Sequence, residues 1–158
     1  MQKYRMDTFD RTIALSLQCD ASLTNSQLAE IVNLSPSQCS RRKAALENSG
    51  IIQGYTARLN PKAMGYKLRA VVRINLASHD GENDNRFSSF VSSCDEILEA
   101  HSVSGDADYV LNIQSENLDS FADFIHNRLL PHPDVSQVRS EIVLKTLKTG
   151  NATKSDSE

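Results

Sequence analysis

The chain has 158 residues, of which 39% are hydrophobic, 6% aromatic and 23% charged. This composition is typical of one globular domain or two small ones, and it excludes collagen-like, disordered and disulfide-dense proteins. No hydrophobic run is long enough for a signal peptide or a membrane span, so we expect a cytoplasmic protein without a membrane partner. Cys19, Cys39 and Cys94 show no C-x-x-C spacing, and they indicate neither a disulfide framework nor a zinc site.

Charge differs between the two parts of the chain. Residues 1–60 carry seven Lys and Arg against five Asp and Glu, whereas residues 61–158 carry ten against fifteen. An anionic partner therefore suits the N-terminal part. Because a surplus of two positive charges is too small to indicate nucleic-acid binding by itself, the motifs have to decide.

The first predicted helix begins near the N-terminus. Asp7 can cap its opening amides. Hydrophobic residues then recur at every fourth position, which is typical of one buried helix face. These residues are Phe9, Ile13 and Leu17. We expect the helix to end within residues 19–23.

The sequence predicts two further helix starts, each with a capping box. In Thr24-Asn25-Ser26-Gln27 the first and last side chains can each accept a hydrogen bond from a free backbone amide. Ser35-Pro36-Ser37-Gln38 repeats this pattern and adds a proline at the first helical position. Gly50 suits the end of the third helix. The expected buried face of the second helix consists of Leu28, Ile31 and Val32.

The second and third helices are separated by a very short turn, Asn33 and Leu34 before the Ser35 cap, as in a helix-turn-helix. The third helix would then be the recognition helix, whose N-terminal end enters a major groove. Helical spacing turns Cys39 and Leu46 inward. The outward side, which we expect to face the base pairs, consists of Ser37, Gln38, Arg41 and Ala44.

Specific contacts follow from these residue types. Arg41 can bind guanine through O6 and N7, and Gln38 can bind adenine, whereas Arg42 and Lys43 are expected to contact phosphates. The candidate DNA-binding residues are Ser35, Ser37, Gln38, Arg41, Arg42 and Lys43. A packing unit of three helices with a solvated Arg-Arg-Lys run is the alternative. Double-stranded DNA is favoured because two capping boxes and a short turn coincide with the only basic cluster.

The C-terminal half predicts an α+β domain. Residues 67–77 alternate between hydrophobic and polar types, as in a strand with one buried face. The remaining elements are expected to be a helix around 87–94, strands at 97–104 and 109–113, a helix at 118–129 and a strand at 135–147. Strand, helix, strand, strand, helix, strand is the ferredoxin-like βαββαβ order.

Four segments follow from these elements. We expect a helix-turn-helix DNA-binding domain at 1–50, a connecting strand or linker at 51–66, and a ferredoxin-like sensing and oligomerisation domain at 67–148. The polar tail, residues 149–158, is expected to be disordered.

Several motifs, taken in order, resemble the Lrp/AsnC (feast/famine) family of transcription regulators over about residues 7–148. They are Leu28-Ala29, Leu34-Ser35-Pro36-Ser37, Cys39, Arg42, Leu46-Glu47, Gly50-Ile51-Ile52, Gly54-Tyr55, Val103-Ser104-Gly105-Asp106 and Asp108-Tyr109. The resemblance implies a winged-type helix-turn-helix domain, a connecting strand and a ferredoxin-like domain that forms homodimers and often octamers. It also implies an amino-acid effector, held between dimers near the glycine-aspartate turn, and no cofactor.

The turn has the chemistry that such an effector needs. Backbone amides at Ser104 and Gly105 can receive a carboxylate, and Asp106 or Asp108 can accept from an ammonium group. His101 lies in the preceding strand and is assigned to the rim of the site. From the residues alone, Gly105-Asp106 is better explained as a plain hairpin turn, and the family resemblance reverses this preference.

The sequence departs from the family in the recognition helix. Lys43 replaces a usually apolar residue, and Ala44-Ala45 stand where basic residues are frequent. Fewer phosphate contacts per dimer are therefore expected, and an octamer would compensate through several linked contacts.

Two other functions compete with DNA-binding regulation. The same fold resembles enzymes that decarboxylate sirohaem, and a sensor without DNA binding is the other possibility. Neither half of the chain shows a catalytic constellation, so we expect no enzyme activity. No metal site is expected, because His101, His126 and His132, with Cys94 and Asp134 nearby, lack the spacing of metal ligands.

Overall fold

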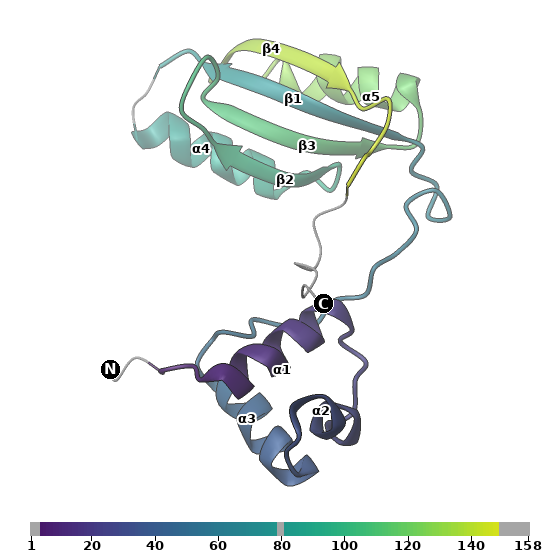
Figure 1. Ribbon diagram of the computed structural model, residues 1–158. Helices are drawn as coiled ribbons and strands as arrows, with labels where there is room; N and C mark the ends of the chain where they lie inside the picture. Colours follow the sequence, from purple (N-terminus) through teal and green to yellow (C-terminus); the bar gives the residue numbers. More distant parts are fainter. Residues whose placement is uncertain (1–3, 79–80, 149–158) are drawn as a thin grey trace. The chain divides into compact units, whose positions relative to one another are not determined.

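The computed structural model describes residues 4–78 and 81–148. Contacts divide the chain into two compact units (Figure 1). The described part of the helical unit is residues 4–58 with Lys148, and the sheet unit is Leu59–Leu147. Each is described by itself. None of the described helices combines the length and the hydrophobicity that crossing a bilayer demands.

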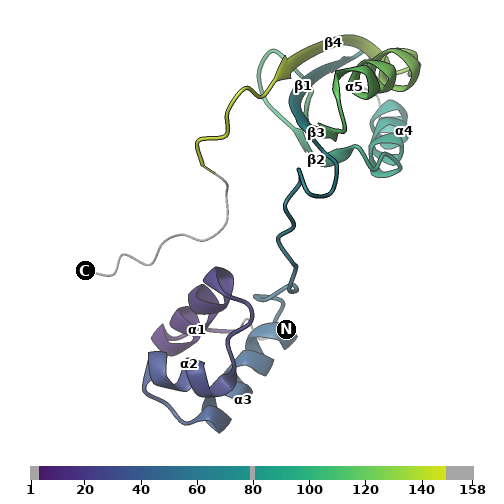
Figure 2. The ribbon, with the colours of Figure 1, turned by 90° about the vertical axis from the view of Figure 1, so that its right-hand side faces the viewer.

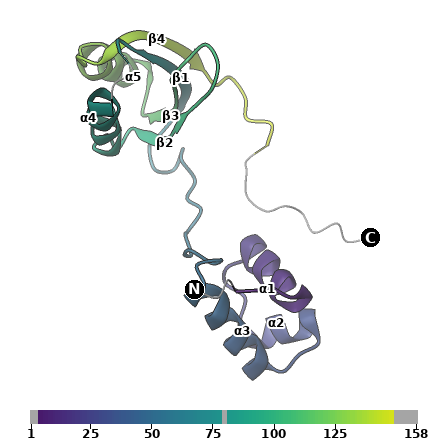
Figure 3. The same ribbon diagram turned by 90° about the vertical axis from the view of Figure 1, so that its left-hand side faces the viewer.

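The helical unit contains three helices, α1 (Thr8–Cys19), α2 (Asn25–Val32) and α3 (Pro36–Asn48), which Figure 3 shows together. All three predicted helix starts are confirmed, and each is a complete capping box. The pairs are Asp7 with Asp10, Thr24 with Gln27 and Ser35 with Gln38. Gly50 follows α3 with φ +74°, a left-handed conformation that glycine adopts without strain.

A small core holds the three helices together. Its buried residues are Ile13, Leu17, Leu28, Ala29, Val32, Cys39 and Leu46. Two residues expected in this core are exposed instead, Phe9 at 42% and Ile31 at 47%. Phe9 differs because its ring packs beneath the guanidinium group of Arg42 at the edge of the unit.

The sheet unit is an antiparallel four-stranded sheet in the order β2-β3-β1-β4. Both helical segments cover the same side of this sheet (Figure 2). The elements in chain order are β1 (Leu68–Leu76), α4 (Gly81–Ser92), β2 (Ile97–Ser102), β3 (Tyr109–Ser115), α5 (Leu118–Phe124), the π-helix η1 (Ile125–Leu129) and β4 (Val135–Ile142). The predicted ferredoxin-like arrangement is therefore confirmed.

The alternating pattern of β1 explains the core of this unit. Val72 and Ile74 are fully buried, and Val72 lies opposite Leu111 of β3. Phe87 of α4 is also fully buried and joins the same hydrophobic cluster. Helix spacing on α4 and strand spacing on β1 thus supply the two halves of one core.

Several element boundaries differ from the sequence prediction. Helix α4 begins at Gly81 and ends at Ser92, β2 ends at Ser102, and β3 extends to Ser115. The helix at 118–129 changes into a π-helix at Ile125. β4 ends at Ile142 rather than at 147, because its partner strand β1 begins at Leu68 and offers Arg69 O to Val143 N as a last bond. Residues 53–60, expected to be a connecting strand or a linker, form neither helix nor strand, which agrees with a linker. The predicted disordered tail, 149–158, lies outside the described residues.

Candidate DNA-binding surface and effector turn

The outward side of α3 is arranged as its helical spacing predicts. Ser37, Gln38, Arg41 and Ala44 are exposed. Cys39 and Leu46, on the opposite side, are fully buried in the core of the helical unit. The N-terminal half of α3 therefore presents polar side chains and one arginine to solvent, as base readout requires.

The capping box of α3 constrains Gln38. Its Oε1 accepts from Ser35 N at 3.0 Å and from Ser35 Oγ at 3.1 Å, and Ser35 Oγ lies 3.0 Å from Ser37 Oγ. Bidentate binding of adenine needs this same oxygen as an acceptor, together with Nε2 as a donor. Gln38 can therefore offer Nε2 to a base at once, but it pairs with adenine only after its cap opens.

The three basic residues of α3, Arg41, Arg42 and Lys43, lie in different surroundings. Arg41 is exposed and has no hydrogen-bond or ion-pair partner within the described part of the chain. Arg42, assigned to a phosphate from the sequence, instead turns toward α1. Its Nη1 donates to Asp7 Oδ2 at 2.7 Å and to Asp10 Oδ1 at 2.6 Å, and these carboxylates raise the pKa of the guanidinium.

Lys43 lies over an aromatic ring that follows the helix. Its Nζ is 4.9 Å from the centre of the Tyr55 ring, a cation–π distance. The Tyr55 hydroxyl donates to Glu47 Oε1 at 2.7 Å. Burial and this hydrogen bond raise the pKa of Tyr55 to about 12, so the phenol stays protonated. Lys43, Glu47 and Tyr55 thereby tie the segment after α3 to the helix.

The predicted effector turn joins β2 and β3. Ser104, Gly105 and Asp106 are exposed, and Gly105 has φ +136°, a conformation that other residues rarely adopt. Within the described residues, the amides of Ser104 and Gly105 donate to no protein acceptor. Free amides beside an exposed carboxylate suit an amino acid, because the amides can bind its carboxylate and the protein carboxylate can bind its ammonium group.

Asp108 anchors this turn to β1. Its Oδ2 accepts from Leu76 N at 2.8 Å, and its backbone amide donates to Ile74 O at 2.9 Å. Asn75 Nδ2 donates to Asp106 O at 2.8 Å. The carboxylate of Asp106 thus remains at the exposed edge, while that of Asp108 holds the backbone. The turn is longer than a tight hairpin, because β2 ends at Ser102 and β3 begins at Tyr109.

His101 lies on the exposed edge strand β2, 3.9 Å from Glu99 Oε2. His132 packs against the rings of Phe87 and Phe90 instead. The structure does not bring His101 and His132 into one site. Over residues 4–78 and 81–148, no three His, Cys, Asp or Glu side chains gather as metal ligands would.

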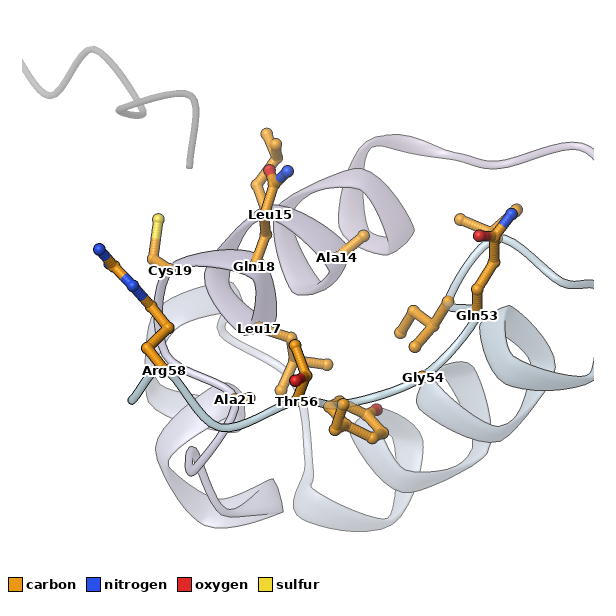
Figure 4. A pocket seen from close by; sticks show the side chains of 13 residues that line it. Ala14, Leu15, Leu17, Gln18, Cys19, Ala21, Gln53, Gly54, Thr56 and Arg58 are labelled. Carbon is orange, nitrogen blue, oxygen red and sulfur yellow. The ribbon is translucent and has the colours of Figure 1, made fainter. Parts of the chain in front are cut away.

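A groove of about 610 Å³ lies within the helical unit, between α1 and residues 51–58 (Figure 4). Its lining mixes aliphatic and polar side chains, and its ionisable side chains are Cys19, Tyr55 and Arg58. The Tyr55 hydroxyl is bonded to Glu47. The groove therefore offers no carboxylate or histidine for acid–base chemistry.

Comparison with known proteins agrees with both units. A winged helix-turn-helix DNA-binding family matches residues 6–53, and the Lrp/AsnC ligand binding domain family matches residues 69–153. The chain belongs to the Lrp/AsnC family. It is a DNA-binding transcription regulator that carries the ligand-binding domain of that family.

Relatives match over nearly the whole chain. The leucine-responsive regulatory protein of Rhizobium meliloti is 36% identical over 92% of this chain and 94% of its own length. Its counterpart in Escherichia coli strain K12 is also 36% identical, over 92% of this chain and 89% of its own length.

Solved structures agree as well. A transcriptional regulator of Neisseria meningitidis, crystallised in complex with L-Met, superposes with a TM-score of 0.89 at 33% identity and covers 94% of this chain and 95% of its own. An AsnC family regulator of Agrobacterium tumefaciens superposes with a TM-score of 0.87 at 32% identity, with the same coverage of both chains.

Sequence reasoning missed the acidic partners of Arg42. Asp7 was identified only as a cap, and Asp10 had no assigned role, although Asp10 is 2% exposed. The one available signal was the spacing of two carboxylates by three residues at a helix start. That spacing suggests a capping box but does not name an arginine 32 residues further along the chain.

Proposed function

We propose that this regulator binds pseudo-palindromic DNA as a dimer and responds to a free amino acid. In this proposal Gln38 and Arg41 contact base edges, and Ser35, Ser37 and Lys43 lie close enough to the duplex for phosphate contacts. Two recognition helices would enter successive major grooves, about 34–36 Å apart. We place the protein in the cytoplasm, because a DNA-binding regulator has to reach its DNA.

A single observation carries the DNA-contact proposal. Arg41 is an exposed guanidinium near the N-terminal end of α3, with no partner in the described chain, next to an exposed Gln38. A free guanidinium at that position is what bidentate recognition of guanine requires. The intact basic helix also favours regulation over an enzyme of the same fold.

For the effector we propose the turn between β2 and β3. The amides of Ser104 and Gly105 would receive the carboxylate, Asp106 would accept from the ammonium group, and Asp108 would keep the turn on β1. His101 would lie at the rim. The exposure of the turn supports a site completed by a second copy, such as one between dimers, and the L-Met complex of the Neisseria regulator supports the ligand class.

Selection of bound fragments from a random DNA pool tests the first part. Wild type should enrich a palindrome, and Arg41→Ala should relax the preferred base at one position in each half-site. No enrichment by wild type would instead favour a sensor without DNA binding.

A thermal-shift screen of the twenty amino acids tests the second part, because a ligand that binds the folded state raises its melting temperature. Asp106→Ala should abolish the shift without changing the unliganded melting temperature. An undiminished shift would contradict the assigned role. An absorbance change on mixing with a tetrapyrrole would point to the enzyme alternative.

A further inference from the structure

Asp10 is a buried carboxylate whose two oxygens are both occupied. Its Oδ2 accepts from the Tyr4 hydroxyl at 3.0 Å and from Asp7 N at 3.1 Å, while its Oδ1 accepts from Arg42 at 2.6 Å. In the described chain, Arg42 is the cation that neutralises it. Removing one partner of a buried ion pair leaves an uncompensated charge, which is strongly unfavourable.

Two further contacts hold the Arg42 guanidinium, one with an aromatic ring and one with a second carboxylate. The guanidinium carbon lies 5.3 Å from the centre of the Phe9 ring, and Asp7 Oδ2 takes a second bond from the same Nη1. The Arg42 side chain is 25% exposed. Moving this group to a DNA phosphate would break two charge-assisted bonds and a ring contact at once.

These bonds join α3 to the first turn of α1. Hydrophobic packing through Cys39 and Leu46 holds the two helices together but tolerates small rotations. The two charge-assisted bonds from Arg42 Nη1 to carboxylates of α1 are directional. Arg41 is the preceding residue, and its side chain leaves the helix about 100° around the axis from that of Arg42. Fixing Arg42 on α1 therefore fixes the direction in which Arg41 leaves α3.

We propose that Arg42 is a positioning residue, which sets the angle of the recognition helix on α1 and does not contact a phosphate. The inference rests on the proposed function, because it requires Gln38 and Arg41 to face the bases. It predicts that Asp10, on a different helix, affects DNA recognition in the same way as Arg42.

Salt dependence separates positioning from phosphate contact. Each phosphate contact adds about 0.9 to the slope of log K against log salt concentration. The full-length protein is titrated between 50 and 300 mM KCl, with the DNA selected by wild type and with a scrambled duplex. The variants are Arg42→Gln and Asp10→Asn, singly and together, with Arg41→Ala as the control, all below their measured melting temperatures.

Arg42→Gln and Asp10→Asn should each reduce the ratio of specific to scrambled affinity by roughly tenfold, the size of one misplaced base contact. The double variant should lose no more than either single variant, and the slope on scrambled DNA should stay that of wild type. Arg41→Ala should also lower the ratio of specific to scrambled affinity, although it leaves the bonds between Asp10 and Arg42 in place.

Three results would overturn the inference. A slope lower by about one in Arg42→Gln, with Asp10→Asn unchanged, would make Arg42 a phosphate contact. Lower melting temperatures with an unchanged affinity ratio would make the network structural only. An unaltered ratio in Arg41→Ala would contradict the proposed DNA face itself, and with it the role of Arg42, whereas the first two results leave that face intact.

Discussion

Asp10 in the helical unit and Asp134 in the sheet unit are the buried carboxylates of the described chain, 2% and 3% exposed. Each is neutralised by an arginine distant in sequence, Asp10 by Arg42 and Asp134 by Arg86. In both units an ion pair therefore joins two segments that lie far apart in sequence. The pairs join different elements, because Arg42 lies on α3, the proposed recognition helix, and Arg86 lies on α4.

The two pairs also differ in geometry. Arg86 forms a fork with Asp134, from Nε to Oδ2 at 3.0 Å and from Nη2 to Oδ1 at 2.6 Å. Arg42 instead shares one nitrogen between Asp7 and Asp10. A fork holds the plane of the guanidinium against one carboxylate. The shared nitrogen of Arg42 is held between two carboxylates at the start of α1, which fixes one point of α3 relative to that helix. We infer that the sheet unit is stabilised by its pair and the helical unit is oriented by its pair.

The comparison requires each unit to have a core of its own, and the largest expected effect tests this. Phe87 is fully buried and packs edge-on against His132, two residues before Asp134 in sequence. Phe87→Ala should lower the free energy of unfolding of the sheet unit by about 3–5 kcal/mol in urea denaturation. Leu144→Ala, at a residue 96% exposed, is the control and should change it by less than about 0.5 kcal/mol. A cost below about 1 kcal/mol for Phe87→Ala would contradict the assigned core.

The next effect separates stabilising from orienting. Arg86→Met leaves Asp134 buried without its cation, so the melting temperature should fall by roughly 5 °C or more in calorimetry. Base preference in DNA selection should stay unchanged. Arg73→Met removes an exposed pair with Glu141 and serves as the control, with almost no expected change. Altered base preference in Arg86→Met would remove the distinction between the two pairs.

Local signals made part of this molecule predictable. The boxes at Thr24 and Ser35, and the stop at Gly50, depend on residues within four positions of each other, so a single sequence reveals them. The alternating pattern of β1 likewise predicted its buried face. These features set the family resemblance and the outward side of α3.

Features that depend on distant partners were not predictable. The contact between Arg42 and Asp10 was not predictable, because nothing near Arg42 in sequence reveals that Asp10 is buried beside it. β4 was predicted too long because its end depends on where β1 begins. The anchoring of Asp108 by Leu76 N, which leaves Asp106 at the exposed edge, also required the fold.

Acid titration sharpens the comparison with a smaller effect. The hydrogen bond from Arg86 lowers the pKa of Asp134, and the backbone hydrogen bond from Asp10, followed by Arg42, lowers the pKa of Asp7. A carboxyl group whose pKa is lowered by folding stabilises the native state at pH values above its pKa in the unfolded chain, near 3.8. This contribution disappears as the pH falls through the lower pKa of the folded state. Urea midpoints of wild type and Arg86→Met should therefore differ at pH 7 and converge below about pH 4. A constant difference down to pH 2 would show that the ion pair is not its cause.

The smallest expected effect compares two capping boxes within the helical unit. Thr24→Ala and Ser35→Ala should each cost about 1 kcal/mol in urea denaturation, because each leaves one helix-opening amide without its acceptor. Only Ser35→Ala also loosens Gln38, whose Oε1 would lose one of its two donors. Easier opening of this cap should strengthen selection for adenine opposite Gln38, whereas Thr24→Ala should leave selection unchanged. Equal DNA selection by both variants would mean that the α3 cap acts on stability alone, and that Gln38 meets the duplex only through Nε2.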